Sequence, residues 1–127
     1  MFSHSSAIHV KKVSRKGYGV FASRFIAQDE EIERVPVLVV PDSCMWQPEG
    51  TSPLARYAFV WGEGTLAIPL GYGALYNHAY QPNARYNDVA GNVKVFTALQ
   101  DILPDTEITI NYNGDPHATQ DVGFQVL

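Results

Sequence analysis

The chain has 127 residues, of which 46% are hydrophobic, and this length and composition fit a single domain with one core. The formal net charge is −4 without a Lys- or Arg-rich run, which argues against direct nucleic-acid binding and is compatible with a basic partner. No apolar run approaches the ~20 residues of a membrane span, and no secretory signal pattern opens the chain, so we expect no membrane segment.

Cysteine and histidine usage argues against a metal site. The single Cys44 excludes an intramolecular disulfide and a cysteine-rich zinc site. The four histidines, at positions 4, 9, 78 and 117, form no HxH or HxxxH pair. We therefore expect no bound metal, and the lone cysteine suits a reducing compartment such as the cytoplasm.

The hydrophobic pattern of the first part of the chain predicts short β-strands. Opening strands are indicated at 8–13 and 20–22, and β-branched residues predict a longer strand at 31–40. Pro36 within that strand favours an edge position or a bend, because proline lacks the N–H that a central strand needs. Residues 41–50, rich in Pro, Asp, Ser and Gly, predict a loop.

One helix is predicted after this loop. Ser52 can cap its start, and Pro53 fits its first position. Four residues then recur at spacings i, i+3, i+4 and i+7, which predicts one shared face. These residues are Leu54, Tyr57, Ala58 and Trp61, and Gly62 and Gly64 end the helix.

The remainder of the chain predicts a β-meander. Residues 90–92 form a turn of the kind that joins the two strands of a hairpin. The domain core is expected at 8–112 and a tail at 113–127, together one domain over 1–127. The expected strands are 65–70, 84–89, 93–99 and 108–110.

Three motifs stand in a fixed order along the chain. Gly17-Tyr18-Gly19 is a turn whose glycines let the backbone approach a ligand closely. Residues 77–83, with the sequence NHAYQPN, form a polar turn, and Tyr112 closes a pattern that begins at Glu107. Each motif alone also has an ordinary structural explanation: the glycine turn as a tight turn between strands, the Asn-His pair as a buried histidine beside a capping asparagine, and Tyr112 as an aromatic residue at a strand end. No P-loop and no GxSxG motif is present.

The order GxG, NHxxxPN and ExxxxY resembles the SET-domain protein-lysine methyltransferases, and the resemblance covers residues 8–112. It is most similar to the minimal virus-encoded and bacterial members, which lack flanking zinc modules. The resemblance implies a mainly β fold of several small twisted sheets with one or two short helices. It also implies a C-terminal pseudoknot, in which the segment carrying Tyr112 passes beneath a loop of the preceding chain.

The resemblance implies the residues of the site as well. Tyr112 would be the catalytic residue and would orient the substrate amine and the methyl group. Aromatic walls would suit the stem and head of a lysine, although core packing is a competing explanation for Tyr57 and Tyr86. The cofactor, S-adenosylmethionine, would be held by Lys16, Gly17, Tyr18, Gly19, Asn77 and His78. The lysine channel would be lined by Tyr57, Tyr86 and Tyr76, with Tyr72 as a further candidate.

The expected function is methyl transfer to the ε-amine of a lysine in a basic protein, such as a histone tail or a histone-like protein. The alternative is an inactive SET-like module that binds a peptide, and the presence of the Asn-His pair and Tyr112 favours the enzyme. Many relatives have a zinc-binding cysteine where this chain has Tyr80. The apolar tail, 124–127, or the second subunit of a homodimer would then wall the channel. The place of action would be the cytoplasm or a host nucleus.

Overall fold

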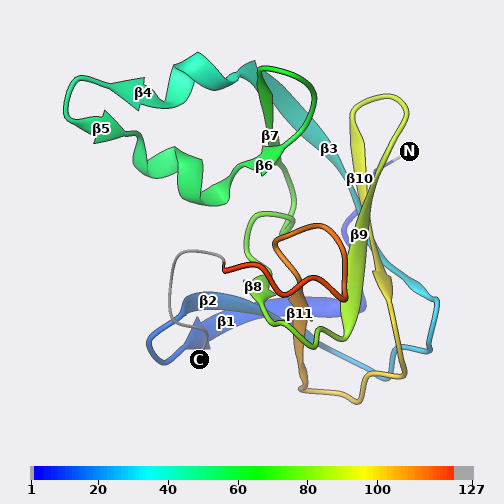
Figure 1. The fold of residues 1–127 in the computed structure, drawn as a ribbon. Coiled ribbons are helices and arrows are strands. Elements are labelled where there is room, and N and C mark those ends of the chain that lie inside the picture. Colours follow the sequence, from blue (N-terminus) through cyan, green and yellow to red (C-terminus); the bar gives the residue numbers. More distant parts are fainter. Residues whose placement is uncertain (1, 122–127) are drawn as a thin grey trace.

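The fold is mainly β, as a computed structural model that describes residues 2–121 shows (Figure 1). Its elements are β1 (Ile8–Val13), β2 (Gly17–Ala22), β3 (Glu31–Pro41), η1 (Asp42–Met45), β4 (Trp46–Gln47), β5 (Gly50–Thr51), η2 (Pro53–Tyr57), β6 (Phe59–Val60), β7 (Thr65–Pro69), β8 (Asn77–His78), β9 (Ala84–Val89), β10 (Val93–Ala98) and β11 (Glu107–Ile110). They form a four-stranded sheet in the order β1-β2-β11-β8 and a five-stranded sheet in the order β6-β7-β3-β10-β9. A two-stranded sheet joins β4 to β5.

Pro36 stands where β3 changes its pairing partner. The residues from Glu31 to Pro36 pair with β10, and those from Val37 to Pro41 pair with β7. The carbonyl oxygen of Pro36 accepts a hydrogen bond from the Leu70 N–H at 3.0 Å. The strand β3 lies inside the sheet and not at its edge. It tolerates Pro36 there because the missing N–H falls between the residues that pair with β10 and those that pair with β7.

The predicted helix is wrong beyond its first turn. Ser52 caps it as expected, since its Oγ accepts from the Leu54 N–H at 3.2 Å. However, η2 is a 3-10 helix that ends at Tyr57, and β6 takes the place of the second half of the predicted helix. Leu54 and Tyr57 are exposed, so the expected shared face is not buried. Pairing of Phe59 with Ala67 of β7 holds the chain extended instead.

The hydrophobic core joins the two large sheets. The four-stranded sheet contributes Val20, Ile108 and Ile110, which are fully buried. The five-stranded sheet contributes Val35 and Phe96 to the same cluster. Burying one such side chain contributes roughly 1.5–3 kcal/mol, so this cluster stabilises the packing of β11 against β3 and β10.

The last strand, β11, brings distant motifs together. It pairs antiparallel with β2 and parallel with β8, where Thr109 lies opposite Asn77 and Ile110 opposite His78. Tyr112 follows two residues after the end of β11. The parallel pairing therefore places the Asn-His pair beside Tyr112, whereas the threaded crossing that the resemblance implies stays a prediction.

Candidate active site

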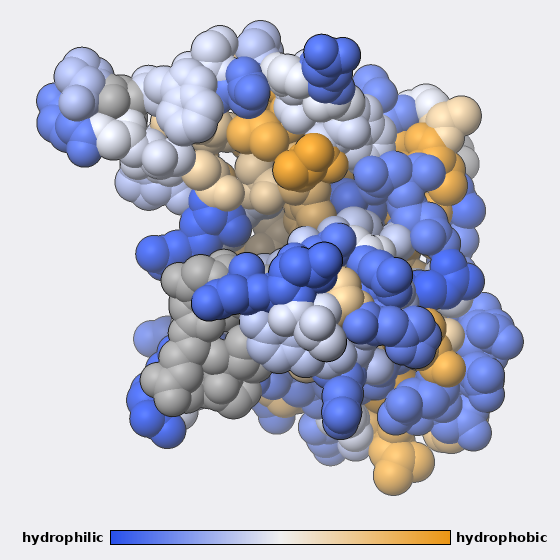
Figure 2. All heavy atoms as spheres, in the orientation of Figure 1, coloured by the Kyte–Doolittle hydropathy of each residue, from blue (hydrophilic) through white to orange (hydrophobic). Residues whose placement is uncertain are grey.

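Two pockets meet around Tyr112. The first, of about 470 Å³, lies beside β6 and β9 and is called the Tyr86 pocket. The second, of about 800 Å³, lies between the β1–β2 turn, η2 and β8 and is called the Lys16 pocket. Figure 2 shows the surface hollowed below the part of the molecule that carries β4 and β5. The residues that line both pockets are Arg56, Tyr57, Ala74, Tyr76 and Tyr112.

Tyr112 is held at this junction by short hydrogen bonds. Its hydroxyl donates to the carbonyl oxygen of Tyr76 at 2.6 Å, and its backbone N–H donates to His78 Nδ1 at 2.9 Å. Burial, together with the charge of Glu107, raises the pKa of Tyr112 to about 12. The phenol therefore stays neutral at physiological pH, so it can direct a ligand by hydrogen bonding without acting as a base.

His78 is buried and supports Tyr112. Because His78 Nδ1 accepts the Tyr112 N–H, that nitrogen carries no proton. The imidazole lies 5.1 Å from the ring of Tyr112 and 4.4 Å from the ring of Tyr80 between centroids. Burial lowers the pKa of His78, which favours this neutral form. His78 is not among the residues that line either pocket, and its contact with a cofactor stays a prediction.

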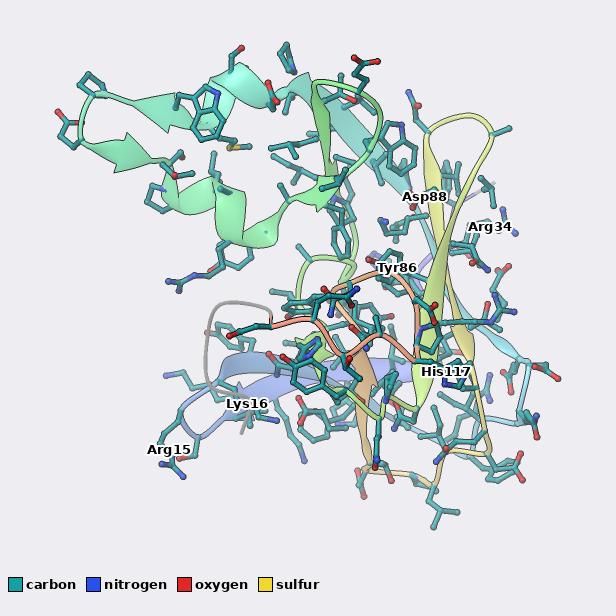
Figure 3. The ribbon with its side chains drawn as sticks, viewed as in Figure 1. Arg15, Lys16, Arg34, Tyr86, Asp88 and His117 are labelled. Carbon is teal, nitrogen blue, oxygen red and sulfur yellow. The ribbon has the colours of Figure 1, made fainter. Side chains whose placement is uncertain are left out.

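Most of the predicted cofactor residues lie together at the Lys16 pocket. Lys16, Gly17, Tyr18 and Asn77 all line it. Figure 3 shows Arg15 and Lys16 on the β1–β2 turn, away from Tyr86 and Asp88 on β9. The lining of this pocket includes three cationic residues, of which the sequence analysis named only one: they are Arg15, Lys16 and Arg56.

Glu107 is a site residue that the sequence analysis did not assign, although it opens the ExxxxY pattern. Its carboxylate lies 3.3 Å from Lys16 Nζ and accepts from Asn77 Nδ2 at 2.7 Å. Asn77 Nδ2 also donates to the carbonyl oxygen of Tyr18 at 3.1 Å. Gly19 leaves room for this network, because a Cβ at that position would lie 2.7 Å from Glu107 Oε2. Glu107 thereby fixes the glycine turn against β8.

The predicted channel residues Tyr57, Tyr76 and Tyr86 all line the Tyr86 pocket, whereas Tyr72 packs against the core. The Tyr86 hydroxyl donates to the carbonyl oxygen of Tyr112 at 3.4 Å. Burial and the charge of Asp88 raise the pKa of Tyr86 to about 12. The pocket is also lined by Phe59, whose ring meets Tyr86 edge-on at 5.0 Å between centroids. Phe59 was not predicted as a site residue, because the apolar spacing of residues 54–61 placed it in a helix.

Tyr76 is fixed from the core side by Glu33. The Tyr76 hydroxyl donates to Glu33 Oε1 at 2.9 Å, and the Tyr72 N–H donates to Glu33 Oε2 at 2.9 Å. Burial raises the pKa of the Glu33 carboxyl. This buried carboxyl therefore ties the segment before β8 to β3, and with it the carbonyl that receives the Tyr112 hydroxyl.

Within residues 2–121, no three His, Cys, Asp or Glu side chains lie close enough together to hold a metal ion. No helix in the same range has the length and apolar character needed to cross a membrane. Cys44 is exposed. The apolar segment 124–127, expected as a wall of the lysine channel, lies outside the described residues.

Comparisons with known proteins identify the family. Residues 17–113 match the family model of the SET domain. A Schizosaccharomyces pombe histone-lysine N-methyltransferase, described as specific for lysine 37 of H3, is 32% identical over 108 residues, which are 84% of this chain and 74% of the relative. A crystal structure of a candidate histone methyltransferase from Plasmodium falciparum superposes with a TM-score of 0.68 at 32% identity, over 85% of this chain and 98% of that chain. The chain therefore belongs to the SET-domain family.

This membership confirms the family and the mainly β SET fold that the three motifs predicted. The two relatives come from a yeast and from Plasmodium. The expected similarity to virus-encoded and bacterial members stays a prediction.

Proposed function

We propose that the chain is a protein-lysine N-methyltransferase that uses S-adenosylmethionine. The observation that carries this proposal is the junction of two pockets at Tyr112, one with cationic residues in its lining and one rich in aromatic side chains. Such a junction suits a reaction between two ligands that approach one point from different pockets. The names of the yeast relative, a histone-lysine N-methyltransferase, and of the Plasmodium protein, a candidate histone methyltransferase, support the reaction class.

S-adenosylmethionine fits the Lys16 pocket by its chemistry. The amino-acid end of this cofactor carries a carboxylate, and the cationic residues Arg15, Lys16 and Arg56 in the lining would attract it. Gly17 has φ +78 with no atom within 4 Å of an added Cβ, so the turn leaves open space beside its backbone. When bound, the cofactor supplies a methyl group on a positively charged sulfur.

The residues of the Tyr86 pocket would orient the lysine and favour its neutral form. At pH 7, deprotonating a lysine with a pKa near 10.4 costs roughly 4–5 kcal/mol. A partly buried aromatic pocket reduces this cost, because desolvation disfavours the ammonium. The neutral phenol of Tyr112 and the carbonyl of Tyr76 would then direct the amine. Positioning of this kind can supply several kcal/mol of the barrier reduction.

A basic protein, such as a histone or a histone-like protein, is the proposed substrate. The chain carries a net charge of −4. This charge would attract a cationic segment. Direct nucleic-acid binding is not part of the proposal, and action in the cytoplasm or in a host nucleus stays a prediction.

The alternative, an inactive peptide-binding module, would not need a polar junction between two pockets. Here the Tyr112 hydroxyl, the His78 imidazole and the Glu107–Asn77 pair are all held in place by hydrogen bonds. This arrangement favours the enzyme.

The test is methyl transfer from labelled S-adenosylmethionine to core histones, a bacterial histone-like protein and a ribosomal protein, with mass spectrometry to locate the label. The proposal expects label on lysine side chains. Cofactor binding by calorimetry without label on any lysine would favour the inactive module. Absence of both binding and transfer would contradict the proposed function.

A further inference from the structure

Lys94 of β10 is wholly buried among aromatic rings. Its Nζ lies 4.1 Å from the ring centroid of Phe59, 4.1 Å from that of Tyr86 and 5.6 Å from that of Trp61. The same ammonium donates to Asp88 Oδ1 at 2.6 Å. A buried charge is costly unless it is paired, so an apolar side chain would fill this space at a lower cost in free energy.

The contacts of Lys94 form a wall of the Tyr86 pocket. Phe59, Tyr86 and Asp88 line the pocket, whereas Lys94 is not among its lining residues and lies behind them. Lys94 stands directly opposite Asp88 in the β9–β10 pairing, and Figure 3 shows Asp88 and Tyr86 on the same strand, β9. Phe59 comes from β6. In the order β6-β7-β3-β10-β9, these are the two edge strands of the five-stranded sheet. The Lys94 ammonium therefore links one edge to the other.

Tyr86 connects this linkage to the reaction centre. Its hydroxyl donates to the carbonyl oxygen of Tyr112 at 3.4 Å, and its ring receives the Lys94 ammonium on its face. Phe59 meets the ring of Tyr86 edge-on, so the two rings and Lys94 fix one another. A change in the Lys94 head group would therefore move the wall that faces Tyr112.

We propose that Lys94 is a positioning residue that sets the width of the Tyr86 pocket from behind its aromatic wall, and thereby the number of methyl groups that a target lysine receives. This inference rests on the proposed function. If Lys94 only filled the space, an apolar side chain of equal length could replace it. Such a replacement would supply neither the attraction between a cation and the ring faces nor the charge-assisted hydrogen bond to Asp88.

The test compares Lys94→Met with Lys94→Arg, using core histones as substrate and mass spectrometry to count methyl groups. Methionine keeps the length of the stem without the charge, whereas arginine keeps a cation that stacks on aromatic rings. We expect Lys94→Met to lower kcat about tenfold, through loss of positioning, and to shift the products toward more highly methylated lysine. Lys94→Arg should keep the wild-type product distribution. The KM for S-adenosylmethionine should stay the same in both, because Lys94 does not line the Lys16 pocket.

Two controls separate positioning from simple packing and charge balance. Lys12→Met removes an exposed lysine and should change nothing. The double variant Lys94→Met with Asp88→Asn removes both charges, so no carboxylate is left without its buried partner. If this double variant unfolds at the wild-type temperature and gives the wild-type products and kcat, Lys94 only fills space and the proposal is overturned.

A second readout decides the inference independently of catalysis. If the wild-type protein methylates no substrate, the proposed function fails, and the role of Lys94 is then judged by nuclear Overhauser contacts between the Tyr86 ring and Gly114. The Tyr86 hydroxyl lies 3.5 Å from the position of a Cβ added to Gly114, which makes this contact a sensitive reporter. Loss of these contacts in Lys94→Met and their return in Lys94→Arg is the expected result. Their retention in Lys94→Met would overturn the proposal.

Discussion

At the scale of single residues, the position of Tyr112 depends on an acceptor that titrates. His78 Nδ1 accepts the Tyr112 N–H only while it is unprotonated. Burial lowers the pKa of His78 below its ordinary value of 6.5, so the unfolded chain binds this proton first as the pH falls. The stability supplied by neutral His78 is therefore present above about pH 6.5 and decreases as the pH falls below it.

The prediction compares the wild-type protein with His78→Asn by calorimetry at pH 7 and at pH 5. Their difference in melting temperature should narrow at the lower pH. Comparing the two proteins at each pH removes the contribution of Glu33, whose raised pKa changes stability in the opposite direction over this range. A difference that does not vary with pH would show that His78 does not titrate in the way the structure implies.

Tyr86 should limit how many methyl groups are added. Its hydroxyl lies near the carbonyl oxygen of Tyr112, and Tyr86 lines the pocket. Tyr86→Phe removes this hydroxyl, so we expect more di- and trimethyl-lysine, measured by mass spectrometry of methylated histones. Stability should change little, because the lost contact is long at 3.4 Å and partly exposed. An unchanged product distribution would contradict the placement of Tyr86 in the lysine channel.

Motif order was enough to predict that Lys16, Asn77 and Tyr112 lie together, and all three line the Lys16 pocket. It could not assign Glu107, because the contacts that define its role join residues 30 and 91 positions apart. Arg56 likewise belongs to the junction only because η2 happens to lie over it. Spacing along a chain reports local geometry, whereas these contacts depend on how strands pair.

At the scale of elements, the predicted helix shows where local pattern fails. The cap at Ser52 is a local signal, and it was correct. The apolar residues that follow the cap are compatible with a longer helix and with a short extended segment. The pairing of β6 with β7 favours the extended segment. Helix propensity is a weak preference that tertiary contacts override. The strands with strong β-branched patterns, such as β3 and β10, were predicted within a few residues of their bounds.

Asn83 holds β11 as a neighbouring strand would. Its Nδ2 donates to the Glu107 carbonyl oxygen at 2.9 Å, and its Oδ1 accepts from the Thr109 N–H at 2.9 Å. Asn83→Ala leaves both backbone groups without these partners, which should cost about 2–4 kcal/mol of unfolding free energy in urea titrations. Asn83→Asp keeps the oxygen that accepts the Thr109 N–H, so its free energy of unfolding should fall by less. A cost within experimental error for Asn83→Ala would mean that β11 is held by its strand pairs alone.

At the scale of the whole molecule, three motifs far apart in sequence meet because β11 pairs with both β2 and β8. Long-range pairings of this kind cannot be read from periodicity, so the residues alone predicted only a mixed β fold with one helix. That the chain forms several small sheets was predicted through the family resemblance, whereas their strand order was not predicted. The meeting of the two edge strands around Lys94 was not expected from either source.

The homodimer suggested by the small core stays a prediction. Leu38 of β3 and Val60 of β6 are large apolar side chains that are 53% and 79% exposed, and a partner subunit could cover them. Light scattering at high protein concentration should then give twice the mass of one chain, and Leu38→Glu should reduce it. The mass of one chain at every concentration would contradict the dimer.

The central claim is that two ligands meet at Tyr112, and the most direct test is single-turnover methyl transfer to core histones by the wild-type protein and by Tyr112→Phe. The variant keeps the ring and loses the hydroxyl that now donates to Tyr76. We predict a rate at least about 100-fold lower, because the amine loses its orientation, while calorimetry shows that S-adenosylmethionine still binds. Transfer by Tyr112→Phe at the wild-type rate would contradict the claim.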